Sequence, residues 1–481
     1  MRKLWILIVF VGATAVADTS PGDHSEVKGA LAITDAWLES KIDFDRVPGI
    51  SFGIVLDQDM LFQKGYGFSN LRRKTPADEN TIYSICSISK LFTGISVMQL
   101  RDQGKLTLRD PVSKHLDYVD LPLVNEMSGP PRIQGMLTHS SGLPRESDFP
   151  YWRDKFPFPD REQMIERLSQ QKMLYAADSL YQYSNLGMAL LGEIVAKASG
   201  KGYETYVQEQ ILDPLNMTDT RPSFPTELHG KQMAIGYTGI GRDQKRKPVK
   251  PFDTKAIASA AGFTSSVADL AKFAQWQFRL LASERLNPDE VLHPNTLREM
   301  QRVHWVDPDW KATYGLGFSV RKVGESTVVG HGGGCPGYIT QFAMVPKHKL
   351  AVIALTNAGD GPAFQIAGSA LKVVGGALAK IKSPSKTSAI DLSDYAGNYA
   401  AGVWGGEAAV RVWGDQLAMI RLPAPEIGDV VKLKHVEGDT FVRLTKEGEE
   451  RHPVVFERNE EGVVTAMKSH SNRTQKILKS S

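Results

Sequence analysis

Cysteine is scarce in this chain: two residues, Cys86 and Cys335, occur in a length of 481. This scarcity excludes a disulfide-rich scaffold and a structural zinc site built from cysteines. The eleven histidines contain no H-x-x-x-H pair, the spacing that places two imidazoles on one helix face as zinc ligands. We therefore expect no metal site.

An excess of one charge is also lacking, because the formal net charge is +3. So small a net charge gives no reason to expect nucleic acid or an anionic membrane surface as a partner. Beyond the first residues, no run reaches the roughly 20 apolar residues that a transmembrane helix requires. We expect no transmembrane segment in the mature chain.

The first residues have the three-part layout of a secretory signal peptide. Arg2 and Lys3 are basic, residues 4–11 are apolar, and residues 15–17 form an A-x-A cleavage pattern. We predict that residues 1–17 are a signal peptide and that the protein is exported, to the periplasm or outside the cell. The alternative is a buried N-terminal strand or an uncleaved anchor.

The remaining composition, with 42% hydrophobic and 23% charged residues, is that of a globular protein long enough for two domains. Hydrophobic periodicity predicts helices from near Gly29 onward and in a long middle region. The strands predicted in this part are 49–56, 61–66, 314–320, 338–345 and 350–356, and the helices include 87–103, 185–198, 267–280 and 363–380. This order implies an α+β domain whose sheet is assembled from both ends of the chain.

The composition changes at residues 382–387, which have the Lys, Ser and Pro content of a linker. Beyond them, short strands alternate with Gly-Asp turns, as in a small antiparallel barrel or sandwich. The predicted strands are 409–413, 417–422, 430–435, 441–445, 452–457 and 463–469. We therefore predict two domains, at 26–382 and 388–481.

The first candidate motif is an S-x-x-K match formed by Ser87 and Lys90 at the start of the strongest predicted helix. Residues three apart on a helix share a face, so the lysine amine can reach the serine hydroxyl. Backbone N–H groups at the helix start face developing negative charge. These are the needs of an activated nucleophile. The plainer interpretation is a helix-capping serine and a solvated lysine.

Two further motifs lie downstream. Tyr183 and Asn185 lead into a helix; a tyrosine near an ammonium group can shuttle a proton, and an amide can bind a substrate carbonyl. His331 and Gly333 lie at the edge of a strand, where glycine permits close approach of a substrate backbone. The alternatives are a helix cap and a Gly-rich turn with a surface histidine. Residues 332–337 also match G-x-G-x-x-G, but Pro336 and the strand that follows exclude a dinucleotide cofactor.

In this order the three motifs resemble those of the serine β-lactamase and penicillin-binding-protein family, in particular its class C branch. The family pattern is S-x-x-K, then Y-x-N, then K-T-G or H-x-G, and the likeness covers residues 30–380. Segments 137–144, 213–217 and 314–317 are also similar. The resemblance implies an antiparallel sheet flanked by helices plus an all-helical subdomain. Residues 394–399 resemble the opening motif of the lipocalin-like barrel that follows this domain in several such proteins. We expect this barrel either to cover the cleft or to mediate homo-oligomers.

The resemblance also implies roles for these residues. Ser87 would attack the substrate carbonyl and form an acyl-enzyme, while Lys90 and Tyr183 share the proton transfers, with the identity of the base left open. Backbone N–H groups of Ser87 and Gly334 would form the oxyanion hole. Asn185, His331 and Gly333 would bind substrate. Both cysteines would lie near the cleft, and we expect free thiols there, with a disulfide as the alternative.

One departure bears on substrate. His331 and Gly332 replace the lysine and hydroxyl residue of K-T-G, which weakens a β-lactamase assignment. We expect a serine hydrolase, without cofactor, acting on an ester or amide in a small molecule or short peptide, as carboxylesterases and D-amino-acid peptidases do. The alternatives are a β-lactamase or DD-carboxypeptidase, and a catalytically silent binder or sensor.

Overall fold

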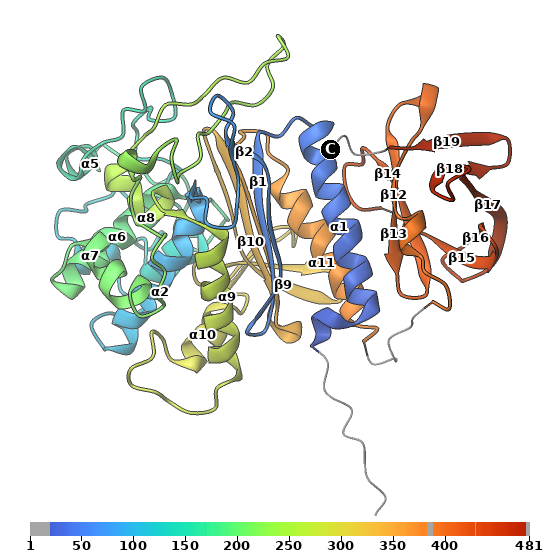
Figure 1. Ribbon diagram of the computed structural model, residues 1–481. Helices are drawn as coiled ribbons and strands as arrows, with labels where there is room; N and C mark the ends of the chain where they lie inside the picture. Colours follow the sequence, from blue (N-terminus) through green and yellow to red (C-terminus); the bar gives the residue numbers. More distant parts are fainter. Residues whose placement is uncertain (1–19, 169, 382–387, 429, 478–481) are drawn as a thin grey trace, which may run out of the picture.

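The computed structural model describes residues 20–168, 170–381, 388–428 and 430–477. A nine-stranded antiparallel sheet stands between two layers of helices, and a closed barrel follows at one side (Figure 1). The predicted signal peptide and the predicted linker lie outside the described residues. Among the residues described, no helix is long and apolar enough to cross a membrane.

The large sheet has the order β3-β2-β1-β11-β10-β9-β8-β7-β6. Its strands are β1 (Gly49–Leu56), β2 (Asp59–Asn70), β3 (Thr75–Pro76), β6 (Trp305–Val306), β7 (Thr313–Tyr314), β8 (Ser319–Val323), β9 (Ser326–Cys335), β10 (Tyr338–Val345) and β11 (Leu350–Thr356). Strand β1 pairs with β2 on one side and with β11 on the other. The sheet is therefore assembled from both ends of the domain, as the sequence predicts.

Helices α1 (Ser25–Asp43) and α11 (Ala363–Leu378) cover one face of this sheet (Figure 1). The other helices form the helical side of the domain. They are α2 (Ser89–Asp102), α3 (Val112–His115), α4 (Ile133–Thr138), α5 (Arg161–Leu168), α6 (Asn185–Ser199), α7 (Tyr203–Val207), α8 (Ala258–Ala261), α9 (Val267–Ala282) and α10 (Pro294–Met300). A two-stranded sheet of β4 (Tyr83–Ser84) and β5 (Thr264–Ser265) joins them.

Helix starts follow local capping chemistry. The Ser184 hydroxyl accepts from the Gly187 N–H at the start of α6, and the Ser266 hydroxyl accepts from the Asp269 N–H at the start of α9. The predicted helix at 87–103 differs at its beginning. Residues Cys86–Ile88 form a 3-10 turn, and α2 starts at Ser89. Ser87 therefore lies in the tight turn that enters the helix rather than in its first regular turn.

The C-terminal domain is a closed antiparallel barrel of strands β12 to β19. They are β12 (Gly397–Ala400), β13 (Glu407–Trp413), β14 (Gln416–Leu422), β15 (Val431–Glu437), β16 (Thr440–Leu444), β17 (Glu450–Arg458), β18 (Val464–Ser469) and β19 (Asn472–Lys476). The sequence predicts six of the eight strands. The first and last strands, which pair to close the barrel, are the two that it misses.

The barrel strands pack on α1, and the loop after β14 contacts α11, where the Ile427 N–H donates to the Ser369 hydroxyl. Both helices lie on the face of the sheet opposite the helical side (Figure 1). Trp413 of β13 seats against Gly29 of α1, and its indole N–H donates to Glu26 over 2.8 Å. The Trp37 indole N–H donates to the Ala424 carbonyl over 3.0 Å. Residues of α1, α11, the sheet and the barrel share one buried apolar cluster. Within a single chain, the barrel thus lies away from the helical side of the sheet.

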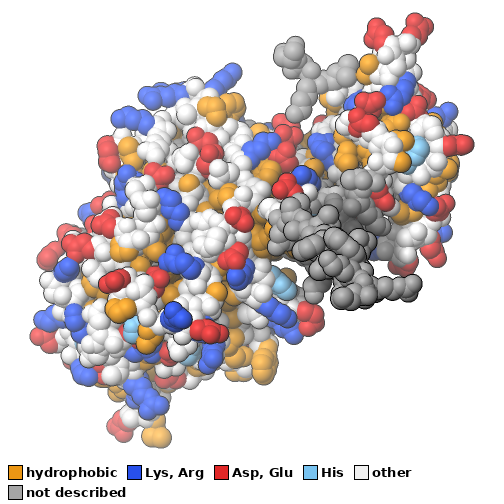
Figure 2. Space-filling model, turned by 60° about the horizontal axis from the view of Figure 1, so that its bottom comes forward, with side chains coloured by type: hydrophobic (Ala, Val, Ile, Leu, Met, Phe, Trp, Pro, Cys, Tyr) orange, Lys and Arg blue, Asp and Glu red, His pale blue; other side chains and the backbone are white. Residues whose placement is uncertain are grey.

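On the face seen in Figure 2, basic and acidic side chains are interspersed over both domains. This mixture agrees with the small net charge of +3.

Candidate active site

Ser87 and Lys90 meet at the junction of the 3-10 turn and α2. The Lys90 ammonium nitrogen lies 3.3 Å from the Ser87 hydroxyl, and it donates to Asn185 Oδ1 over 2.8 Å and to the Ala260 carbonyl over 2.7 Å. The lysine side chain is fully buried. Its amine is therefore held by three oxygens, one of which is the candidate nucleophile.

Tyr183 completes this group from the turn before α6. The Lys90 amine lies 4.8 Å from the centre of the Tyr183 ring, and the tyrosine hydroxyl faces the Ser87 hydroxyl. The structure thus brings Ser87, Lys90 and Tyr183 into mutual contact, although the first two are far from the third in sequence.

Burial affects the two candidate proton carriers in opposite senses. It disfavours the charged amine and lowers the pKa of Lys90 well below its usual range, against the opposing charge of Glu146. Burial also raises the pKa of the Tyr183 hydroxyl, and the hydrogen bond with Ser87 opposes that rise. Burial thus favours the protonated, neutral Tyr183 and shifts Lys90 toward its neutral amine.

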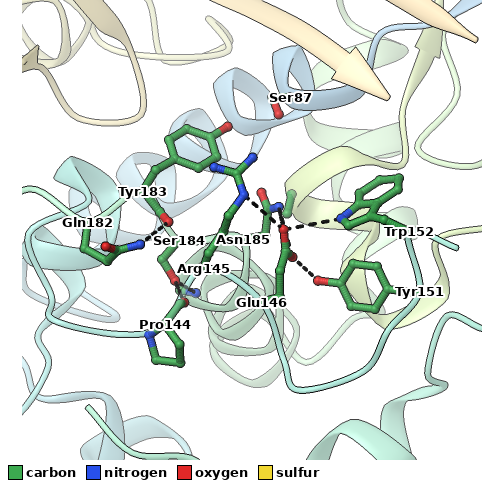
Figure 3. Close-up of polar contacts among 12 residues, drawn as sticks. Ser87, Pro144, Arg145, Glu146, Tyr151, Trp152, Gln182, Tyr183, Ser184 and Asn185 are labelled. Carbon is green, nitrogen blue, oxygen red and sulfur yellow. Dashed lines mark hydrogen bonds and ion pairs between the residues drawn. The ribbon is translucent and has the colours of Figure 1, made fainter. Parts of the chain in front are cut away.

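Asn185 connects Lys90 to a carboxylate that sequence reasoning missed. The Asn185 amide nitrogen donates to both carboxylate oxygens of Glu146, over 2.9 and 3.1 Å (Figure 3). Arg145, beside Glu146, lies over the Tyr183 ring at 4.9 Å. Both residues follow the segment 137–144, whose likeness to the family is the signal that points to this loop.

His331 lies in strand β9, directly after Gly330, the last residue of β9 that pairs with β8. Its Nδ1 donates to the Gly332 carbonyl over 2.6 Å, so its Nε2 accepts from the Tyr314 hydroxyl over 2.5 Å. Burial lowers the pKa of His331 to about 3. The imidazole is therefore neutral at physiological pH and cannot supply the cation of a K-T-G motif.

A cavity of about 340 Å³ opens between these elements. Its lining includes Tyr183, Tyr314, His331, Arg145 and Phe364. It is large enough for a small molecule or for part of a short peptide.

Strand β9 packs directly on the backbone that leads to Ser87. A Cβ atom at Gly333 would lie 2.1 Å from the Ile85 carbonyl oxygen, so only glycine permits this approach. The two cysteines flank the contact, because Cys86 precedes Ser87 and Cys335 follows Gly334.

These cysteines form a disulfide, with a Cα–Cα distance of 5.9 Å. The expectation of free thiols is therefore wrong. Close packing of β9 on the 3-10 turn brings the two Cα atoms to a separation that a disulfide can span, and this proximity cannot be seen from the spacing of the cysteines in the sequence. Among the described residues, no group of His, Cys, Asp and Glu could hold a metal ion.

Comparison with known proteins agrees with this fold. A family model described as beta-lactamase matches residues 34–375, and a model described as a domain of unknown function, DUF3471, matches residues 382–479. The chain belongs to the β-lactamase family.

Among its relatives is the D-alanyl-D-alanine-carboxypeptidase/endopeptidase AmpH of Escherichia coli K12. It is 28% identical over 363 residues, which are 74% of this chain and 91% of AmpH. An octameric penicillin-binding protein homologue from Pyrococcus abyssi superposes with a TM-score of 0.64 at 25% identity, covering 93% of this chain and 100% of the homologue. A D-stereospecific amidohydrolase from a Streptomyces species shares the fold, with a TM-score of 0.58 and 22% identity over 71% of this chain and 97% of that enzyme.

Proposed function

We propose that this protein is a serine hydrolase that cleaves an ester or amide through an acyl-enzyme on Ser87. The contact of the Ser87 hydroxyl with the buried Lys90 amine, at 3.3 Å, carries the proposal. A fully buried amine next to a serine hydroxyl is costly to fold, and a structural role does not require it.

In the proposed mechanism, Ser87 Oγ bonds to the substrate carbonyl carbon as its proton passes to Lys90. The carbonyl electron pair moves onto oxygen, which the backbone N–H groups of Ser87 and Gly334 stabilise. The carbonyl then re-forms and the bond to the leaving alcohol or amine breaks. The leaving group takes a proton from Tyr183, which Lys90 re-protonates. Water hydrolyses the acyl-enzyme by the same steps in reverse order.

The neutral His331 favours a carboxylesterase or a D-amino-acid or short-peptide hydrolase, because no lysine stands at the third motif to bind a substrate carboxylate. In this proposal Asn185, His331 and Gly333 line the substrate site. A DD-carboxypeptidase is the second candidate, and it is favoured by the likeness to AmpH over most of both chains.

We place this activity outside the cytoplasm, in the periplasm or the medium, after removal of residues 1–17. The Cys86–Cys335 disulfide supports an oxidising compartment. We propose that residues 26–382 form the hydrolase domain and that residues 388–481 form the barrel domain. We also infer that copies associate through the barrel, since the octameric homologue aligns over 93% of this chain, a share that includes barrel residues.

Treatment of the purified protein with a fluorophosphonate probe, followed by intact mass, tests the proposal. We expect one adduct on the wild type and none on Ser87→Ala. Absence of an adduct on the wild type, with a related hydrolase labelled under the same conditions, would contradict it and favour a silent binder. A labelled protein is then assayed with matched esters, D-peptides and β-lactams to separate the substrate classes.

A further inference from the structure

Glu146 lies beside the catalytic group with its carboxylate surrounded by donors (Figure 3). It accepts from the Asn185 amide, from the Tyr151 hydroxyl and from the Trp152 indole N–H, the last at 3.3 Å. The Arg145 Nε lies 3.2 Å from the same carboxylate. With its oxygens occupied by protein donors, Glu146 has little capacity left to bind substrate.

The contact with Glu146 determines which way the Asn185 amide faces. Because the amide nitrogen donates to both carboxylate oxygens, the amide oxygen is left for the Lys90 amine, at 2.8 Å. The opposite orientation would place oxygen against carboxylate and N–H against N–H, so it is strongly disfavoured. Glu146 therefore fixes one of the three acceptors that hold Lys90 next to Ser87.

Glu146 also affects the site through its charge. Around Lys90 stand the cationic Arg145 and the buried neutral imidazoles of His139 and His331, and burial opposes a charged amine. Against these, the negative charge of Glu146 raises the pKa of Lys90. It also raises the pKa of Tyr183, the other candidate proton acceptor, on which Tyr181 and Arg145 act as well.

We propose that Glu146 is a positioning residue for the reaction at Ser87. Through Asn185 it fixes the amine of Lys90 toward the serine hydroxyl, and through its charge it stabilises the protonated acceptor that forms when Ser87 loses its proton. This inference rests on the proposed function, because it assumes a nucleophilic Ser87.

The test is the pH dependence of the second-order rate of fluorophosphonate labelling at Ser87, which requires no natural substrate. At low pH the labelling rate falls as the group that accepts the serine proton becomes protonated, and this part of the pH profile is its acid limb. In Glu146→Gln the acid limb is expected to move to lower pH by about one unit, because loss of a nearby negative charge lowers the pKa of the proton acceptor. The plateau rate is expected to fall about tenfold, because the Asn185 amide is less firmly oriented. The direction of the limb shift is the same whether Lys90 or Tyr183 accepts the proton.

Glu193→Gln is the matched control. Glu193 also accepts from a tyrosine and an arginine, Tyr118 at 3.0 Å and Arg161 at 2.7 Å, but it does not contact Ser87, Lys90 or Tyr183 through any contact that the structure describes. We expect a labelling profile like that of the wild type. Glu146→Asp keeps the charge but retracts it by one methylene, so it should label slowly with an acid limb close to that of the wild type.

A folded Glu146→Gln protein with the wild-type limb would overturn the proposal. If that variant does not fold, a Glu146→Asp protein that labels at the wild-type rate would overturn it instead. Thermal unfolding establishes folding for each variant. Failure of the proposed function is a separate result, since the wild type itself would then not be labelled at Ser87.

Discussion

Lys90 carries a side chain that is normally exposed, yet it is fully buried between α2, α6 and α8. The cost of removing an ammonium group from water is offset by oxygens of Ser87, Asn185 and Ala260. The same burial lowers the pKa of Lys90 and so favours the neutral amine, the form that a general base requires. At the level of the residue, desolvation is the physical cause that would allow Lys90 to act as the proton acceptor of the proposed reaction.

Replacement of Lys90 by Met should therefore lower the rate of Ser87 labelling by about 10²- to 10⁴-fold, because the base is lost while an apolar chain fills the space. Lys90→Arg should not restore the rate, since a guanidinium group remains protonated. Labelling kinetics at several pH values measure both. A Lys90→Met protein that is folded by circular dichroism and labels as fast as the wild type would remove Lys90 from the mechanism.

At the level of elements, the site depends on contact between strand β9 and the 3-10 turn of Cys86–Ile88. Gly333 allows β9 to approach the Ile85 carbonyl, and the Cys86–Cys335 disulfide joins the two segments across a separation of 249 residues. The flanked residues, Ser87 and Gly334, are the two proposed donors of the oxyanion hole. A covalent bond thus fixes two backbone segments that are distant in sequence.

The double variant Cys86→Ala/Cys335→Ala should be less stable by about 2–5 kcal/mol, because a long loop is no longer closed in the unfolded chain. It should also label more slowly, because the two backbone segments are less firmly held. Denaturant unfolding and the labelling rate at neutral pH measure the two effects. A less stable variant that keeps the wild-type labelling rate would limit the disulfide to a structural role.

The elements predicted best from the sequence are those with a complete apolar pattern. Strands β1, β10 and β11 have the predicted bounds, because nearly every residue in them is buried. Strand β19, at Asn472–Lys476, is polar and largely exposed, so its pairing gives no periodic signal. The predicted strand 314–320 is divided between β7 and β8, because Gly317 has a positive φ at the turn.

The candidate site could be predicted where motifs carry it. The structure brings Ser87, Lys90, Tyr183 and Asn185 together as their order in the sequence implies. Glu146 lies in a loop without periodicity; the likeness of segment 137–144 to the family points to the loop, but the role of Glu146 follows from its contacts in space. The disulfide likewise depends on tertiary packing.

At the level of the whole molecule, the barrel packs on the outer helix layer of the N-terminal domain. The Trp413 ring fits against Gly29 of α1, where an added Cβ would lie 2.4 Å from the ring. The Lys432 ammonium nitrogen lies over the Trp413 ring, 3.7 Å from the ring centre. Because this interface is on the sheet face opposite the helical side, it contributes to stability at a distance from Ser87.

Trp413→Ala should accordingly lower the free energy of unfolding by about 3 kcal/mol, because it empties an aromatic site in a buried cluster. Gly29→Ala tests the same contact from the other side. Alanine favours a helix over glycine by about 1 kcal/mol, so a loss of stability in this variant would come from the clash with the ring. Both variants should label at Ser87 at the wild-type rate. Urea unfolding measures the change in stability, and labelling kinetics measure the effect on Ser87. Slower labelling in the folded variants would mean that packing of the barrel on α1 also stabilises the active site on the other side of the sheet.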